Sequence, residues 1–270
     1  MFGSSRESLA TLRTALQARH SDASLASVAG ELLAVAGTLS REKALRVALA
    51  DAGTTVATRS GVANSVFSGK VGATTLAIVD EVIAARWSND ADLVAALEVL
   101  GAQAACIAAQ SQNALDRVEE EVFLFGRAVA GSSELQMALT NPSLSAAAKS
   151  GIVESLLAGK AHDITGMLLT ARIADLRGAR VDSAVEELLE VAADQRKRLV
   201  AEVTSAVSLT TEQHARLANA LKSLTGRDIN INVIIDREVL GGIRVRIGDD
   251  LIDGTIASRL ESASRAVKAD

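Results

Sequence analysis

One twelve-residue pattern occurs twice in this chain, at positions 90 residues apart. Residues 59–70 are RSGVANSVFSGK, and residues 149–160 are KSGIVESLLAGK. With the same offset the chain aligns with itself without gaps from about residue 28 to residue 87. Glycines and charged residues recur in register, which chance identity among the many alanines does not explain. Self-similarity at a fixed period indicates that one structural module was duplicated.

The identical pairs span the whole aligned stretch and include residue types that local composition does not favour. They are Val28 with Val118, Glu31 with Glu121, Leu45 with Leu135, Ser60 with Ser150, Gly61 with Gly151, Gly69 with Gly159, Lys70 with Lys160, Thr75 with Thr165 and Ile83 with Ile173.

Both copies show the apolar spacing of amphipathic helices. In residues 25–39 the apolar positions recur every three or four residues, and residues 115–129 repeat this stripe. Hydrophobic residues make up 49% of the chain and aromatic residues only 2%, which is typical of alanine-rich helices that pack closely. One long helix is predicted over about 90–110. By the offset it matches both the last helix of the second copy and the first helix of the first copy. We expect it to be the last helix of the first bundle and the first helix of the second.

From about residue 200 the apolar period changes from 3.6 to 2, which indicates strands. Strands are predicted over 201–209 and 229–235, with a helix over 210–226 between them, followed by a strand with a turn over 243–253 and an amphipathic helix at the end. The residues expected on the inner face of the sheet are Val203, Val207, Leu209, Ile229, Ile231, Val233, Ile235, Ile243, Val245 and Ile247. The last helix would carry the stripe Ile256, Leu260, Ala263 and Val267.

The predicted fold class is therefore mainly α, with two related helical bundles followed by a small α/β domain in the order β-α-β-β-α. The predicted domains are a first helical copy over 1–90, a second helical copy over 91–200 and a C-terminal α/β domain over 201–270.

The Gly-Lys pair in the repeat suggests a phosphate-binding loop, but its surroundings do not fit one. A Walker loop needs a glycine, four residues, and then Gly-Lys followed by Ser or Thr. Asn64 and Glu154 occupy the first glycine position, while Val71 and Ala161 follow the lysines. We interpret the stretch as a helix and its end, with Gly69 as a left-handed C-cap.

The chain offers few groups for catalysis or metal binding. Asp249, Asp250 and Asp253 lack the spacing of a calcium loop, so turn and helix-cap roles are predicted for them. The three histidines are scattered at polar positions and are expected at the surface. Cys106 lies in the apolar stretch AQAACIAAQ and is expected to be buried and unreactive. The sequence thus predicts no catalytic constellation, no metal and no cofactor.

Charge and cysteine content exclude further classes. A net charge of −5 and a pI near 5.4 leave no basic surplus for nucleic acid. A single cysteine allows no internal disulfide and favours a reducing cytoplasm. No apolar run of about 18 residues is evident, so no direct membrane span is expected.

The segment INVIIDREVLGGIRVRIGDDLIDGTIASRL resembles the delta subunit of F-type ATP synthases, which is related to the mitochondrial oligomycin-sensitivity-conferring protein. The resemblance extends over about residues 91–270. Two departures stand out: Ala257 and Ser258 replace an arginine and a glycine that the family often carries, and the first 90 residues exceed the usual family length, as an extended form with a duplicated helical domain would. The signature residues that carry the resemblance are Asp236, Gly241, Gly242, Gly248, Asp249, Asp253, Gly254 and Leu260, with Ile243 and Thr255 beside them.

This resemblance implies a mechanical, non-catalytic role in a bacterial ATP synthase. Such a subunit links the N-terminal helix of an alpha subunit on the catalytic head to the b subunits of the peripheral stalk, and prevents co-rotation during proton-driven ATP synthesis. It would lie at the cytoplasmic face of the cell membrane as a peripheral protein. As a partner groove we consider the seam formed by Val94, Leu97 and Leu100 on one helix with Leu168 and Ile173 on another. The alternative is that these five side chains form the core of the bundle.

Two other functions stay open at this point. One is a generic helical adaptor, which would have no need of the C-terminal signature. The other is a nucleotide-binding enzyme, which the Walker spacing argues against in both copies.

Overall fold

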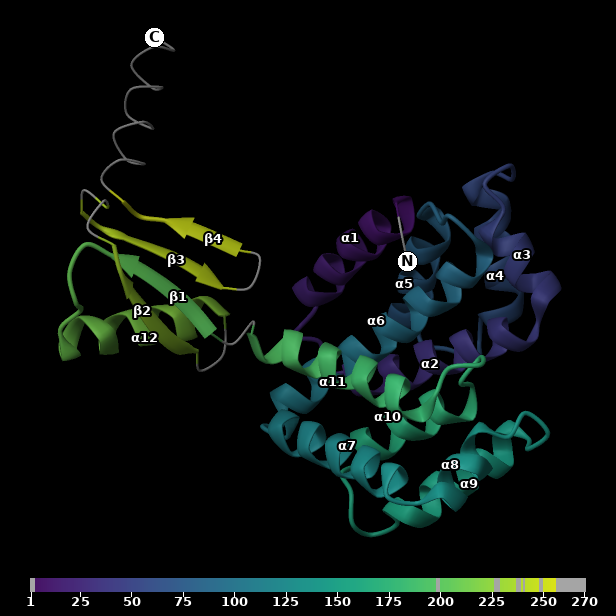
Figure 1. Cartoon of the computed structure of the whole chain (residues 1–270). Coiled ribbons are helices and arrows are strands. Elements are labelled where there is room, and N and C mark those ends of the chain that lie inside the picture. The colour runs from purple at the N-terminus through teal and green to yellow at the C-terminus, as the bar shows by residue number, and fades with distance from the viewer. Residues whose placement is uncertain are drawn as a thin grey trace. The chain divides into compact units, whose positions relative to one another are not determined.

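The computed structural model describes residues 3–197, 200–225, 229–236, 239, 241–247 and 250–255. The chain forms two compact units, Met1–Ala193 and Asp194–Asp270. We call them the helical unit and the sheet unit (Figure 1). The predictions for Gly248, Asp249, Leu260 and the last amphipathic helix concern residues outside the described ranges.

The helical unit contains helices joined by short turns, and the last helix, α11, extends past the boundary of this unit to Lys197. Their bounds are α1 Ser4–Ala18, α2 Leu25–Arg41, α3 Lys43–Ala50, α4 Val56–Phe67, α5 Ala73–Ala84, α6 Asp90–Ser111, α7 Leu115–Ala130, α8 Ser133–Thr140, α9 Ala146–Leu157, α10 Asp163–Ala174 and α11 Val181–Lys197.

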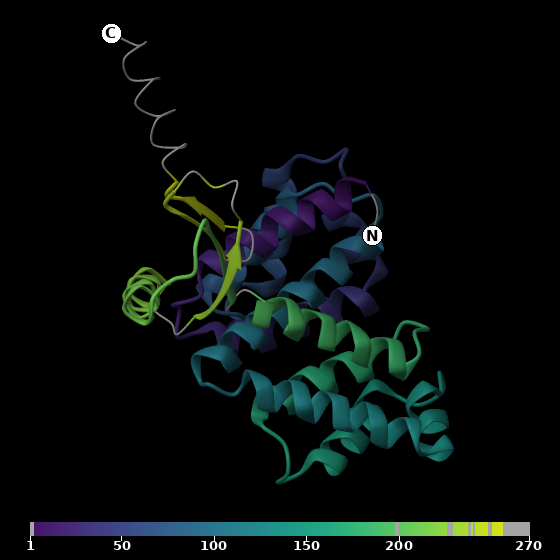
Figure 2. The ribbon, with the colours of Figure 1, turned by 60° about the vertical axis from the view of Figure 1, so that its left-hand side comes forward.

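The helix bounds follow the 90-residue offset. Helices α3, α4 and α5 begin and end 90 residues before α8, α9 and α10, and α2 begins 90 residues before α7. Figure 2 shows the two sets on opposite sides of the helical unit, with α1–α5 in purple and blue and α7–α11 in teal and green. The division at residues 90 and 200 remains a prediction, which these matched bounds support.

Helix α6 lies between the two sets and contacts both. It packs against α1, α2, α3 and α5 on one side and against α7 and α10 on the other. Every residue from Leu100 to Gln110 is buried. At Gly101 an added Cβ would lie only 2.9 Å from the Cγ atom of Leu33 on α2, so these two helices approach closely. The predicted long helix is confirmed, and its contacts agree with a role in both bundles.

In the described residues, α6 is also the helix with the length and apolar composition of a membrane span, which the sequence analysis did not identify. Its most apolar 18-residue window is 72% buried inside the structure. Helices that are apolar all round are buried in a core or a membrane. Contacts with neighbouring helices on both sides account for this composition without a membrane.

A glutamate caps the start of the fifth helix in each copy. The Oε2 atom of Glu121 on α7 accepts hydrogen bonds from the backbone N–H of His162, at 2.8 Å, and from the hydroxyl of Thr165, at 2.6 Å. Glu31 on α2 makes the matching pair 90 residues earlier, and its bond from the Gly72 N–H is 2.9 Å. A carboxylate at a helix N-terminus satisfies free N–H groups and opposes the positive end of the helix dipole. The duplicated module thus retains its internal contacts.

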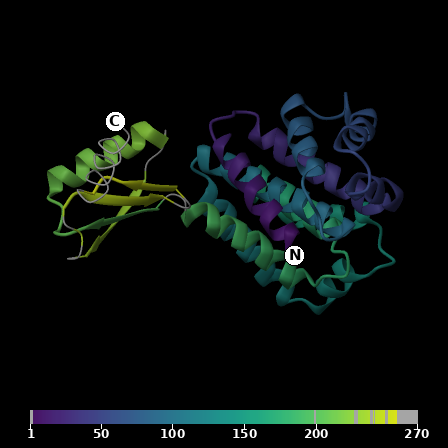
Figure 3. The ribbon, with the colours of Figure 1, turned by 90° about the horizontal axis from the view of Figure 1, so that it is seen from above.

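The sheet unit contains β1 Val200–Ser205, α12 Thr211–Thr225, β2 Asn230–Ile235, β3 Ile243–Ile247 and β4 Asp250–Asp253. The strand order is β2-β1-β3-β4. Strands β1 and β2 are parallel, with α12 as the crossover between them, and the other pairs are antiparallel. Figure 3 shows α12 along one face of the sheet. The small core under α12 consists of Ala201, Val203, Leu221 and Val245.

The fold class is confirmed: helical bundles precede a small α/β unit. The segment expected to form one strand with a turn instead forms two strands, so the described sheet has four strands. Asp250 begins β4, where it lies opposite Ile247, rather than in a turn. The alternation of Ile243, Val245 and Ile247 inward with arginines outward is confirmed.

Two predicted inner-face residues are exposed. Val207 is 69% exposed because β1 already ends at Ser205, so the alternation does not extend to it. Ile235 is 55% exposed at the end of β2, which is an edge strand. The alternation of apolar and polar residues in the sequence continues beyond the residues that pair with a neighbouring strand and are covered by α12.

Candidate partner-binding site

The seam proposed from the sequence is closed in the structure. Its side chains are at most 2% exposed, so they form the core between α6 and α10, as the alternative interpretation states. These residues are Val94, Leu97, Leu100, Leu168 and Ile173. A partner helix cannot reach them in this arrangement.

Helix α2 is one reason why the seam is closed, because it packs against both α6 and α10. Leu33 lies against Gly101 of α6, as described above. On the α10 side, an added Cβ at Gly30 would lie 3.2 Å from the Sδ atom of Met167. Side chains of the first copy therefore contact the second copy at this point.

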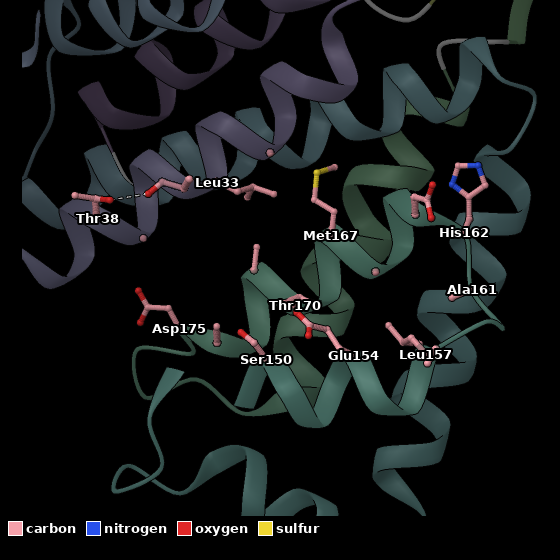
Figure 4. A pocket seen from close by; sticks show the side chains of 18 of the residues that line it. Leu33, Thr38, Ser150, Glu154, Leu157, Ala161, His162, Met167, Thr170 and Asp175 are labelled. Carbon is pink, nitrogen blue, oxygen red and sulfur yellow. Dashed lines mark hydrogen bonds between the residues drawn. The ribbon is translucent and has the colours of Figure 1, made fainter. Parts of the chain in front are cut away.

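An open groove lies beside this contact, between α2 on one wall and α9 with α10 on the other (Figure 4). We call it the junction groove. Its volume is about 680 Å³. Gly30 and Gly37 of α2 and Gly166 of α10 line it, together with the half-buried side chains of Leu33 and Met167. Its surface is therefore partly apolar and has few bulky side chains.

The charged residues that line the junction groove are mostly acidic. Glu154, Asp163 and Asp175 contribute carboxylates, and Arg41 contributes the one Lys or Arg side chain among the lining residues. His162 also lines it, but the His162 Nδ1 atom accepts a hydrogen bond from the N–H of Ile164 at the start of α10. His162 therefore serves as a helix cap there.

Asp175 stands apart from the other lining acids. Its Oδ2 atom is buried and has no hydrogen-bond partner in the described structure. Figure 4 shows Asp175 at one end of the groove, across from Thr38, with His162 at the other end. A buried acceptor without a donor costs about 1–3 kcal/mol.

This groove was not predicted from the sequence. Gly30, Ala34 and Gly37 recur along one face of α2, away from its apolar stripe. That spacing of small residues was the available signal, since a face without bulky side chains permits close approach. Which helices would lie opposite could not be inferred from spacing within one helix.

The described signature residues of the sheet unit stabilise the backbone conformation at its turns and strand ends. Gly242 has a φ of 82°, and an added Cβ would lie 2.5 Å from the carbonyl oxygen of Gly254. Gly254 in turn donates its N–H to the carbonyl of Ile243 at 3.0 Å. Only glycine fits at Gly242, because both the conformation and the close approach exclude a side chain.

Asp236 and Asp253 also have local roles. The N–H of Asp236 donates to the carbonyl of Ser205 at 2.9 Å. The Oδ1 atom of Asp253 accepts hydrogen bonds from the hydroxyl and the N–H of Thr255, at 2.7 and 3.0 Å. These bonds hold the pKa of Asp253 below its ordinary value. In the described residues the signature thus organises the turn and strand ends, and its role in binding stays a prediction.

The Gly-Lys pairs are helix ends, as interpreted from the sequence. Gly69 and Gly159 have φ values of 74° and 68°. In both copies the N–H of the following lysine donates to a carbonyl three residues earlier, at 2.9 Å. Backbone N–H groups that a phosphate would need are used inside the turn.

The structure holds Cys106 in an unreactive state. The thiol is buried, and burial raises its pKa to about 12. Among the described residues no group of three His, Cys, Asp or Glu side chains is placed to hold a metal ion.

Comparison with known proteins agrees with the resemblance found in the sequence. The family model described as ATP synthase delta (OSCP) subunit matches residues 102–267. ATP synthase subunit delta of Streptomyces coelicolor is 42% identical over 267 residues, which cover 98% of this chain and 97% of the relative. The proteins of the same name from Parafrankia sp. and Nocardia farcinica are each 38% identical, and each match covers 99% of the relative.

The relatives are matched over nearly their whole length, so the first 90 residues are part of the similarity. Among solved structures, a chain of the Toxoplasma gondii mitochondrial ATP synthase hexamer covers 64% of this chain at 20% identity, with a TM-score of 0.34, too low to carry an argument. From the family model and the full-length relatives together, we conclude that the chain belongs to the ATP synthase delta (OSCP) subunit family.

Proposed function

We propose that this chain links an alpha subunit to the b subunits of the peripheral stalk, at the cytoplasmic face of the membrane. In this proposal the helical unit binds the N-terminal helix of an alpha subunit. The sheet unit binds the ends of the b subunits. This arrangement deepens what family membership already gives: a non-catalytic stator subunit, associated with the other subunits of the membrane-bound ATP synthase.

The observation that carries the proposal is the division of the chain into two compact units. A stator must hold two partners at once, so it needs two independent contact regions. The helical unit offers the junction groove. The sheet unit offers exposed apolar side chains on its edge strands, Leu251 and Ile252 on β4 and Ile234 on β2.

Energetics favour two moderate contacts over one strong contact. Burial of four leucine-sized anchors of a partner helix contributes about 6–12 kcal/mol. Association and ordering cost about 4–15 kcal/mol, which removes most of that gain. When both ends are bound, the second contact forms at high effective concentration. Family membership also decides against a generic helical adaptor and against a nucleotide-binding enzyme.

Native mass spectrometry tests the proposal. The full chain would be mixed with a peptide of the alpha subunit N-terminus and with a soluble C-terminal segment of the b subunit from the same organism. The proposal predicts one complex that contains all three components. Binding of the two partners that is mutually exclusive, or binding of neither, would contradict it.

A further inference from the structure

We infer that a second pocket of the helical unit binds the phosphate group of a small soluble molecule, with Lys149 as the cation that holds it. Residues from the end of α7, from α8, from the start of α9 and from the loop between α10 and α11 line this pocket, whose volume is about 810 Å³. We call it the Lys149 pocket. It shares only Ala174 and Asp175 with the junction groove, and the proposed function assigns no subunit contact to it.

Lys149 is a buried cation without a partner in the chain. It is only 7% exposed, yet it lines the pocket. Its Nζ atom forms no hydrogen bond or ion pair with any residue that the structure describes. Lysine is almost never buried to this degree unless it is paired, because a buried ammonium has three N–H groups to satisfy. An acceptor that enters the pocket would supply what the chain itself lacks.

The first copy shows how the same position is satisfied without a ligand. The counterpart of Lys149 there is Arg59, whose Nη1 atom donates to the carbonyls of Leu49, at 3.2 Å, and Ile83, at 2.5 Å. The shorter lysine makes neither of the matching bonds among the described residues. Its ammonium is therefore available to the pocket.

A further difference between the copies removes an acid from this region. In the first copy Arg46 donates to two carbonyls at the end of α2, and its Nε atom lies 2.7 Å from the Oδ2 atom of Asp90. In the second copy Gln136 donates to the two matching carbonyls of α7, and Arg180 stands at the position of Asp90. Gln136 and Arg180 both line the pocket. An ion pair has thus become a neutral side chain and a cation, which favours an anion from outside the chain.

Cations outnumber acids among the residues that line the pocket. The cations are Lys149, Arg177 and Arg180, and the acids are Asp175 and Asp182. Arg180 pairs with Asp182 at 2.8 Å, and Arg177 pairs with Glu98 on α6. A guanidinium has five N–H donors. Arg180 gives Asp182 only its Nε–H and one Nη2–H, so it keeps donors that can bind an oxyanion.

A phosphate group suits this arrangement better than a carboxylate or a lipid surface. It carries about two negative charges at pH 7 and three terminal oxygens, so it can accept N–H groups from α9 and from the loop before α11 together. A carboxylate has one charge and two oxygens. A lipid surface would meet the exposed cations of the chain, but it could not reach a lysine that is almost fully buried.

Calorimetric titration of the full-length chain with potassium phosphate, at constant ionic strength, tests the site. Lys149→Met should weaken phosphate binding by at least about tenfold, because it removes a charge-assisted hydrogen bond. Lys160→Met is the matched control, since Lys160 is exposed and does not line the pocket. This control should bind phosphate like the unsubstituted chain. Thermal melting shows that each variant is folded.

Two further measurements address the charge and the shape of the ligand. Asp175 lines the pocket, and its negative charge opposes that of a bound phosphate. Asp175→Asn should therefore tighten phosphate binding by about threefold. Acetate, titrated in the same way, should bind at least about tenfold more weakly than phosphate, because it offers one charge and two oxygens.

A loss of binding in Lys149→Met but not in Lys160→Met supports the site, as does tighter binding by Asp175→Asn. Equal binding by Lys149→Met and the unsubstituted chain would overturn it, and so would equal losses in the two lysine variants or an unsubstituted chain that binds no phosphate. Acetate that binds as tightly as phosphate would show that the assignment to phosphate is wrong. None of these results bears on the stator role, which native mass spectrometry tests separately.

Discussion

The two helical copies share their internal contacts and differ at their outer faces. The glutamate cap and the glycine helix end recur at the same positions in both. Helix α1, however, is exposed along one face, whereas α6, its counterpart by the offset, is buried from Leu100 to Gln110. The duplicated contacts hold each bundle, and the outer faces were free to change because they meet different neighbours.

Equivalent positions on α2 and α7 show the same divergence. Leu33 on α2 packs against α6, but its counterpart Phe123 on α7 is 50% exposed. Leu124, next to it, is 55% exposed. The first copy uses this face to contact the second copy, whereas the second copy presents it to solvent. The contacts inside one copy can therefore be inferred well from the other copy, but the contacts each copy makes with its neighbours cannot.

The largest expected effect is at the contact between the copies. Gly101→Leu would place a side chain where Leu33 already lies, with 2.9 Å to its Cγ atom. We expect a loss of about 3 kcal/mol in the free energy of unfolding. Thr11→Leu, the same position in the first copy, faces solvent on α1 and should change stability by less than about 0.5 kcal/mol. Urea unfolding followed by the fluorescence of the single tryptophan, Trp87 in the helical unit, measures both. Equal losses would contradict the account.

Substitution of Arg59 and of Lys149 should change the free energy of unfolding by different, smaller amounts. The two residues occupy equivalent positions in the two copies, and both are buried. The Nη1 atom of Arg59 donates to the carbonyls of Leu49, at 3.2 Å, and Ile83, at 2.5 Å, at two helix ends. Arg59→Met should cost about 2–3 kcal/mol because these carbonyls lose their donor. The Nζ atom of Lys149 donates no hydrogen bond within the described part of the chain, so Lys149→Met should be neutral or slightly stabilising. The same unfolding assay compares them, and a larger loss at Lys149 would reverse the comparison.

The glutamate caps should behave alike. Glu31→Ala and Glu121→Ala each remove the acceptor of the two matching hydrogen bonds and should cost about 1–3 kcal/mol. Glu121 also pairs with the exposed Arg117, which should add no more than about 0.5 kcal/mol to its loss. Thermal melting of both variants measures this. A clear difference between them would mean that the copies are not equivalent at this contact.

Glu121 also makes stability depend on pH. Burial raises its pKa, but hydrogen bonds from Thr165, His162 and Arg117 outweigh burial and leave the pKa below 4.5. A lowered pKa means that the carboxylate stabilises the fold above pH 4.5, and that this contribution is lost as the pH falls through the folded pKa. Below that pH, the free energy of unfolding should therefore fall less steeply with decreasing pH in Glu121→Gln than in the unsubstituted chain. Parallel curves would contradict this.

The smallest expected effect is at the glycine helix ends. Gly69→Ala and Gly159→Ala each force alanine into a left-handed conformation and should cost about 1 kcal/mol. Gly61→Ala, in the interior of α4 with open space around it, should instead stabilise by about 0.5–1 kcal/mol. Melting temperatures of the three variants provide the test. A stabilising effect at either helix end would show that the cap is not needed.

Much of the fold could be predicted because it depends on local signals. The repeat indicated which helices correspond, and alternation identified the inner face of β3. Val207 and Ile235 were assigned wrongly, because strand ends depend on pairing and cover that a single strand does not reveal. The junction groove could not be predicted, since it requires the position of α2 against α9 and α10. Lys149 became a candidate binding residue only once its buried side chain was seen to line a pocket.

The most direct test of the bridging role is photo-crosslinking in the assembled ATP synthase. Arg41→Cys at the junction groove and Leu251→Cys on β4 would each introduce one accessible thiol, since Cys106 is buried with a pKa of about 12. Each thiol would carry a benzophenone label. The account predicts crosslinks to an alpha subunit from position 41 and to a b subunit from position 251. Crosslinks from both positions to the same subunit, or none to alpha from position 41, would contradict it.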